Sequence, residues 1–174
     1  MKNKLMPTII LGSICLVAAL LLSVINLITA PEIARRQEAE AYAALLEVLP
    51  EGEGFEQIAL DEVSLDAKIA SAWAATKSGG YVFQLKTSGK YDGIIIMIGV
   101  DEDGKIAGTK CIENKETAGY ANKVFSVTED GYYVGQDSAS FNPYVVSGST
   151  MTSEAYSGAV KAALDAYGIL KGGN

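Results

Sequence analysis

Hydroxyl side chains crowd a short stretch near the carboxyl end of the chain, SGSTMTS at residues 147–153. A run rich in alanine follows it, with the spacing of an α-helix. The first backbone amides of a helix have no partner within the helix, so together with the helix dipole they attract anions. A hydroxyl placed there could hold a phosphate group or become esterified to one.

Serine and threonine are also the usual capping residues of a helix N-terminus. The residues alone therefore favour an ordinary helix cap over a phosphate site. A serine nucleophile of the hydrolase type is disfavoured because the chain contains no histidine to act as its base. A Ser–Lys pair with Lys123 or Lys161 stays open, although nothing in the sequence supports it.

Composition and charge exclude several classes of function. The 174-residue chain has a formal net charge of −7, and all its 21 acidic residues lie after Lys2 and Lys4. Such an acidic domain disfavours binding to nucleic acid or to anionic lipid. Cys15 lies in an apolar stretch and Cys111 outside it, so we expect no disulfide framework. We expect no metal site either, because the acidic turn at 101–103 is typical of a solvated hairpin tip.

An uncharged segment at residues 8–30 predicts a transmembrane helix. About 20 apolar residues span a bilayer, whereas the apolar part of a secretory signal peptide has only about 7–15 residues. Length therefore favours a retained anchor over a cleaved signal. Lys2 and Lys4 precede the segment, which places the N-terminus in the cytoplasm. We expect a single-pass protein of the inner (cytoplasmic) cell membrane, with the rest of the chain on the extracytoplasmic side.

The remaining sequence predicts an α+β fold, with an antiparallel sheet flanked by helices. Apolar residues alternate at 81–87, and a continuous β-branched run at 91–100 is typical of a buried strand. A turn at 101–104 leads to a return strand at 105–113. These three strands form the predicted centre of the sheet.

Helices and irregular segments surround these strands in the prediction. Residues 31–50 have helical spacing, either as a stalk or as a solvated helix packed on the domain. Segment 66–80 is ambiguous and could form a short helix. We expect a loop with a helical turn at 114–124, and strand-like FSVTED and YYVGQ within 125–146. A helix at 152–170 would present a face of alanines to the sheet.

Two separated motifs resemble those of a known family. The stretch SGSTMTS at 147–153 resembles the SGATxTS motif of FMN-binding domains in which a threonine is joined to FMN through its phosphate. Such domains occur in the RnfG subunit of the Rnf electron transport complex and in a related subunit of the sodium-pumping NADH:quinone oxidoreductase. A second stretch resembles the family's glycine-led strand, GID-x-x-GKI hairpin and ETPGLG loop: GIIIMIGVDEDGKIAGTKCIENKETAGYANKV at 93–124. The resemblance covers nearly the whole chain.

This resemblance implies a covalently attached FMN on Thr150, placed there by a separate flavin transferase. It implies no catalytic residue in the chain itself, because the domain is the substrate of that transfer. Ser147, Gly148 and Ser149 would shape the turn, and Thr152 and Ser153 would cap the helix or bind the phosphate. The implied contacts to the flavin lie in the loop and are Glu116, Thr117, Gly119 and Tyr120.

The sequence departs from the family pattern at both motifs. Ser149 stands where the family has alanine, which adds a second hydroxyl beside the expected attachment point. In the loop, Ala118, Tyr120 and Ala121 replace proline, leucine and glycine. The loop could be less rigid as a result, and Tyr120 could present its ring to the flavin.

The chain would then have three parts: a cytoplasmic tip and transmembrane helix at 1–30, a helical stalk or linker at 31–54, and an extracytoplasmic FMN-binding domain at 55–174. We expect it to carry electrons within an ion-translocating ferredoxin:NAD oxidoreductase of the Rnf type, as one component of the complex rather than an enzyme alone. Its partners would be the other membrane subunits. Two alternatives stay open: a stand-alone anchored flavoprotein that feeds an extracytoplasmic reductase, and a non-redox assembly module.

Overall fold

The computed structural model describes residues 11–12, 15–16, 18–21, 23, 29, 41–60 and 65–172. The chain divides into two compact units, Met1–Ala41 and Tyr42–Asn174. In the first unit, the residues described are helical. None of the helices formed by described residues is long and apolar enough to cross a membrane. Most of the span predicted at 8–30 lies outside those residues.

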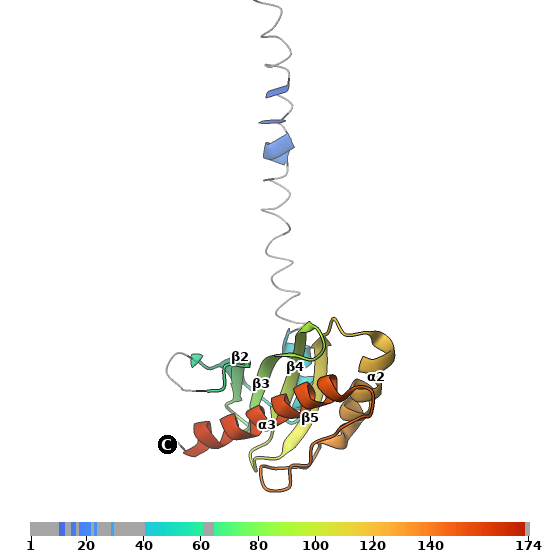
Figure 1. The fold of residues 1–174 in the computed structure, drawn as a ribbon. Helices are drawn as coiled ribbons and strands as arrows, with labels where there is room; N and C mark the ends of the chain where they lie inside the picture. The colour runs from blue at the N-terminus through green and yellow to red at the C-terminus, as the bar shows by residue number, and fades with distance from the viewer. Residues whose placement is uncertain are drawn as a thin grey trace, which may run out of the picture. The chain divides into compact units, whose positions relative to one another are not determined.

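A five-stranded antiparallel sheet forms the centre of the second unit (Figure 1). Its strands are β1 (Phe55–Gln57), β2 (Ile69–Ala75), β3 (Tyr81–Ser88), β4 (Asp92–Val100) and β5 (Ile106–Glu113). Each strand pairs with the next one along the chain, so the sheet is a simple meander. The predicted α+β class is confirmed, and so are the three predicted strands between 81 and 113.

The sheet is covered on both faces, which explains why β4 is apolar after Asp92. Successive side chains of a strand point to opposite faces. Phe83 and its register partner Ile98 belong to a core cluster that includes the buried side of helix α3 (Thr150–Gly172). Val82 and Met97 belong to a second cluster, in which they pack with residues of the helix formed by 41–48. A strand buried on both faces needs apolar side chains at every position.

The helix at 41–48 reaches the sheet over a pair of glycines. Gly99 of β4 and Gly108 of β5 are register partners. A Cβ atom at Gly108 would lie 2.9 Å from the carbonyl oxygen of Val48, and one at Gly99 would come closer still. Only hydrogen atoms fit in this space. Of the two arrangements left open for the helix, its described part packs on the domain, where Leu45 and Val48 are buried.

Three helical segments complete the second unit: α2 (Ala118–Val127), the short π-helical η2 (Thr128–Tyr132) and α3. Helix α3 contacts β3 and β4. The alanine face predicted for it is confirmed, since its members Ala159 and Ala163 are fully buried. Small side chains let the helix axis lie close to the strands.

Two local predictions need correction. Segment 66–80, which could have formed a short helix, contains strand β2. Pairing with β1 on one side and β3 on the other overrides the helix preference of its alanines. The strand-like FSVTED lies in α2 and η2, and YYVGQ runs from the end of η2 into turns. Short apolar runs do not distinguish a strand from a buried helix, and Phe125 is buried here on a helix.

The glycine pair under Val48 gives a test of the fold. We expect Gly99→Ala to lower the free energy of unfolding by about 1–3 kcal/mol, because the added methyl group overpacks the contact. The matched control is Gly168→Ala in α3, where a Cβ meets no atom within 4 Å. Alanine is the better helix former by up to about 1 kcal/mol, so this variant should be neutral or more stable. Urea unfolding of both variants measures the difference, and equal stabilities would contradict the close contact.

Candidate functional site

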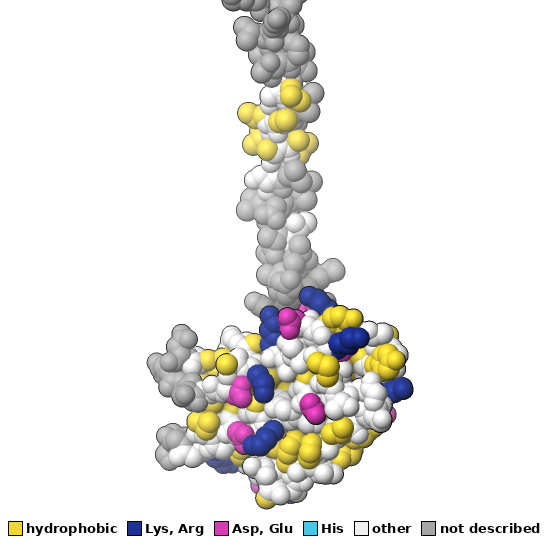
Figure 2. Space-filling model, viewed as in Figure 1, with side chains coloured by type: hydrophobic (Ala, Val, Ile, Leu, Met, Phe, Trp, Pro, Cys, Tyr) yellow, Lys and Arg dark blue, Asp and Glu magenta, His cyan; other side chains and the backbone are white. Residues whose placement is uncertain are grey.

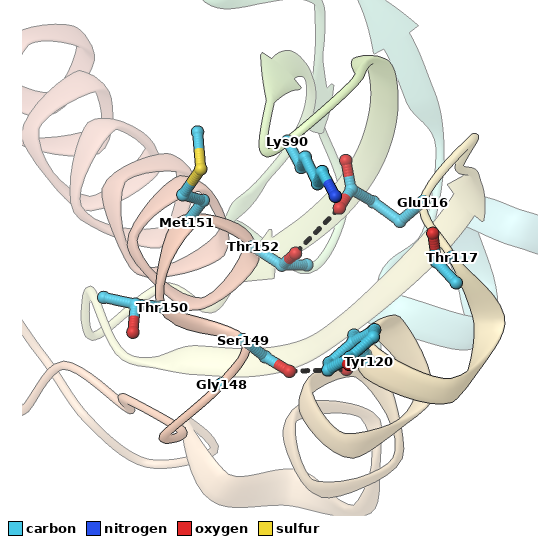
Figure 3. A pocket seen from close by; sticks show the side chains of 9 residues that line it. All are labelled: Lys90, Glu116, Thr117, Tyr120, Gly148, Ser149, Thr150, Met151 and Thr152. Carbon is cyan, nitrogen blue, oxygen red and sulfur yellow. Dashed lines mark hydrogen bonds between the residues drawn. The ribbon is translucent and has the colours of Figure 1, made fainter.

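The hydroxyl cluster and the predicted flavin loop line a single cavity of about 490 Å³ (Figure 3). This volume lies within the usual range of small-molecule sites, about 300–1,000 Å³. The residues that line it are Lys90, Glu116, Thr117, Tyr120, Gly148, Ser149, Thr150, Met151 and Thr152. Three predicted site residues, Ser147, Gly119 and Ser153, do not line it.

Two helix N-termini meet at this cavity. Thr117 is the N-cap of α2 and makes no side-chain capping bond, while Thr150 is the first residue of α3. Both helices therefore direct their positive ends and first amides towards the same space. The cavity is suited to hold an anionic group, which is the chemistry that the hydroxyl cluster indicated.

A tight turn brings the chain into α3. The Ser149 amide donates to the carbonyl oxygen of Val146 at 3.0 Å, which closes a four-residue turn. Gly148, the third residue of the turn, has a φ of +83°. A positive φ at this position is the mark of a type II turn and favours glycine. The glycine of the motif is thus required by the backbone.

Ser153 stabilises the same turn from within the helix. Its hydroxyl donates to the Ser149 carbonyl oxygen at 2.9 Å and accepts the Val146 amide at 3.1 Å. The side chain is fully buried. Ser153 therefore shapes the entry into α3 instead of facing the cavity.

The hydroxyl of Ser149 connects the two motifs. It donates to the carbonyl oxygen of Tyr120 at 3.0 Å, and no described amide of α3 donates to it. The side chain is 5% exposed. The residue that departs from the family's alanine thus ties the start of α3 to the first turn of α2.

Glu116 forms a second tie at the cavity. Its carboxylate accepts the Thr152 hydroxyl at 2.9 Å and the Tyr91 amide at 2.8 Å. These bonds connect three segments: the β3–β4 turn, the loop before α2, and the start of α3. Gly89 packs closely on the carboxylate, since a Cβ there would lie 3.0 Å from Oε1.

The open side of the cavity combines a cation with exposed apolar groups. Tyr120 and Met151 expose 54% and 58% of their surfaces, and Thr150 is exposed beside them. Lys90 is the single basic residue of the lining. Sequence reasoning missed Lys90 and Met151. Met151 lies inside the SGSTMTS motif, whereas Lys90 belongs to a turn that only the folded chain brings to the cavity.

The arrangement is suited to binding a cofactor. The single carboxylate of the lining, Glu116, bonds to Thr152 and Tyr91 and not to Thr150. No general base is therefore placed at the Thr150 hydroxyl by the residues that the structure describes. An exposed hydroxyl, two helix N-termini and an exposed aromatic ring fit the phosphate and the flat ring of a flavin mononucleotide.

Comparison with known proteins identifies the domain. Residues 89–165 match the family model of the FMN-binding domain, and this range contains every residue that lines the cavity. Residues 3–48 match the family model of the RnfG N-terminal region. A curated relative, the G subunit of the ion-translocating oxidoreductase complex of Stutzerimonas stutzeri, is 28% identical over 120 residues, which are 66% of this chain and 53% of the relative. Residues 89–165 thus match an FMN-binding domain, and the chain resembles RnfG.

FMN is accordingly the cofactor that the cavity is expected to hold. The chain spans about half the length of the curated relative that it matches. The two stretches singled out in the sequence, the loop at 116–121 and SGSTMTS, both lie within the matched FMN-binding domain. The structure brings them together at one cavity although the 25 residues from 122 to 146 lie between them.

Substitution of two threonines in the first turn of α3 tests the hydrogen bond between Thr152 and Glu116. Thr152→Val removes the hydroxyl that donates to the half-buried Glu116 carboxylate, and we expect it to lower the free energy of unfolding by about 1–3 kcal/mol. Thr150→Val makes the same change at an exposed site and should stay within about 0.5 kcal/mol of the parent. Urea unfolding of the two variants gives the comparison. A Thr152→Val variant as stable as Thr150→Val would show that the bond contributes nothing.

Proposed function

We propose that this chain is a membrane-anchored flavoprotein that carries electrons within an ion-translocating oxidoreductase complex of the Rnf type. The observation that carries the proposal is the convergence of an exposed threonine hydroxyl and two helix N-termini on one cavity inside an FMN-binding domain. The similarity to the G subunit of such a complex supports the assignment to that class of assembly. The other membrane subunits of the complex would be its redox partners.

Thr150 is the proposed attachment point of the FMN phosphate. Within the hydroxyl cluster, Ser149 and Thr152 also line the cavity, but their hydroxyls donate to Tyr120 and Glu116. The Thr150 hydroxyl makes no hydrogen bond in the described part of the chain, and the residue is exposed. It is therefore accessible to an enzyme and has no bond to lose when it becomes an ester.

A separate flavin transferase would make this linkage. In the proposed transfer, the Thr150 oxygen attacks the FMN phosphorus of FAD, the bond to the AMP phosphate breaks, and AMP leaves. The proton of the hydroxyl passes to a base of the transferase, since the cavity offers Thr150 none. The phosphodiester keeps one negative charge, which the N-terminus of α3 would stabilise by about 0.3–1 kcal/mol.

Replacement of the threonine tests this proposal. We expect Thr150→Ala, produced as the full chain together with a flavin transferase, to lose all covalent flavin while it remains folded. The matched controls Ser149→Ala and Thr117→Ala should stay flavinylated, because neither residue carries the ester. In-gel fluorescence after denaturation and peptide mass mapping measure the outcome.

Two results would contradict the assignment. Covalent flavin on Thr150→Ala would move the attachment to another hydroxyl, with Ser149 the first to examine. A parent chain that stays unmodified beside an active transferase would favour the alternative of a non-redox module with an ordinary capped helix.

The proposal includes a single transmembrane helix at residues 8–30, with the FMN-binding domain on the extracytoplasmic side. The basis is the uncharged length of the segment and the two lysines before it. We expect protease added to intact spheroplasts to digest the domain. A cytoplasmic protein of the same cells, which must stay intact, is the control. Digestion only after lysis would reverse the orientation.

A further inference from the structure

Lys90 is held at the FMN cavity by the way its turn is anchored. The Tyr91 amide donates to Glu116 Oε1 at 2.8 Å, and Gly89 packs on the same carboxylate. The residues on both sides of Lys90 are therefore fixed against the loop that precedes α2. The lysine lines the cavity because of this anchoring, although no sequence motif includes it.

The ammonium group of Lys90 makes no hydrogen bond and no ion pair within the described part of the chain. The neighbouring carboxylate, Glu116, accepts its bonds from a hydroxyl and an amide, and no ion pair joins it to Lys90 among the described residues. The ammonium lies over the ring of Tyr91, whose centre is 5.6 Å away. This cation is available to an anion inside the cavity.

The face of the domain that Figure 2 shows has no extended basic patch to which Lys90 could belong. On this face, basic and acidic side chains are interspersed, without an extended patch of one sign. The chain as a whole is acidic. A cation kept free at a cavity of an acidic protein therefore indicates a local partner in that cavity.

Thr150 and Lys90 would face different parts of FMN, the phosphate and the ring that becomes anionic on reduction. Figure 3 shows Lys90 and Thr150 on different sides of the cavity, on the β3–β4 turn and on α3. A phosphate joined to Thr150 leaves the isoalloxazine ring to extend into the space that Lys90 lines. We propose that Lys90 faces this ring and stabilises the negative charge that the ring carries when reduced, an inference that rests on the proposed attachment at Thr150.

The physical effect is on the reduction potential. Reduction by two electrons from a redox partner, with uptake of one proton at N5, leaves one negative charge shared by N1 and the C2 carbonyl oxygen. A nearby cation stabilises the charged form and so raises the potential. The phosphodiester has the same charge in both redox states, so a lysine that contacted only the phosphate would leave the potential nearly unchanged.

Charge replacement at Lys90 tests the inference. The full chain, produced with the flavin transferase, is compared as parent, Lys90→Gln, Lys90→Arg and Lys86→Gln. Lys86 is exposed on the same hairpin and does not line the cavity, so it controls for the change in net charge. Two properties are measured on the oxidised and reduced flavin: the midpoint potential and the affinity for sulfite, which adds to N5 and places the same negative charge on the ring.

We expect Lys90→Gln to shift the midpoint potential to more negative values and to weaken sulfite binding roughly tenfold, equal to about 1.4 kcal/mol. Lys90→Arg keeps the charge and should resemble the parent, and Lys86→Gln should too. High salt should reduce the difference between Lys90→Gln and the parent, because the cavity is open to solvent.

Flavin fluorescence separates failure of this inference from failure of the proposed function. Absence of covalent flavin from the parent chain would overturn the attachment, and this inference with it. Normal flavin content with unchanged potential and sulfite affinity in Lys90→Gln would overturn the role of Lys90 alone. An equal shift in Lys86→Gln would also overturn it, because the effect would then come from net charge.

Discussion

The cavity depends on one carboxylate. Glu116 accepts a hydroxyl from α3 and an amide from the β3–β4 turn, and it lies itself just before α2. Hydrogen bonds to a charged group contribute more than those between neutral groups, about 1.5–3 kcal/mol each. Without these two bonds, the β3–β4 turn would lose its hydrogen bond to the loop before α2, and α3 would be tied to α2 at the cavity by the Ser149–Tyr120 bond. The geometry of the FMN site therefore follows from where this side chain is held.

The hydroxyls of SGSTMTS divide into three that bond within the site and two, Ser147 and Thr150, that make no hydrogen bond among the described residues. Ser153 closes the turn, Ser149 ties α3 to α2, and Thr152 holds Glu116. Each of these bonds consumes the donor of its hydroxyl. Thr150 lies among them with its hydroxyl exposed at the N-terminus of the helix. Among the three described hydroxyls of the motif that line the cavity, Thr150 is thus the one that donates to no neighbour.

The parts of the fold that the sequence predicts are those encoded locally. The β-branched run of β4 and its hairpin to β5 carry their own signals, and so does the alanine face of α3. Strand β2 does not, because its alanines become a strand through pairing with β1 and β3. The site shows the same division. Gly148 is recognisable from its motif and its turn, whereas the place of Lys90 depends on the Tyr91–Glu116 bond between residues 25 positions apart. Side chains whose role is set by such distant contacts are visible only once the chain is folded.

The glycine pair under Val48 also determines how the domain bears mechanical load. Tension applied through the residues before Tyr42 would enter the domain along the helix at 41–48. This helix packs on β4 and on the edge strand β5, and its Tyr42 ring contacts Phe55 of β1, the opposite edge strand. The contact between Gly99 and Val48 lies near the Val100 end of β4, whereas the turn before its Asp92 end carries Lys90, which lines the cavity. Pulling would thus act on a packed helix that contacts several strands instead of peeling off one strand. The load would therefore enter the sheet at the end of β4 that lies away from the cavity.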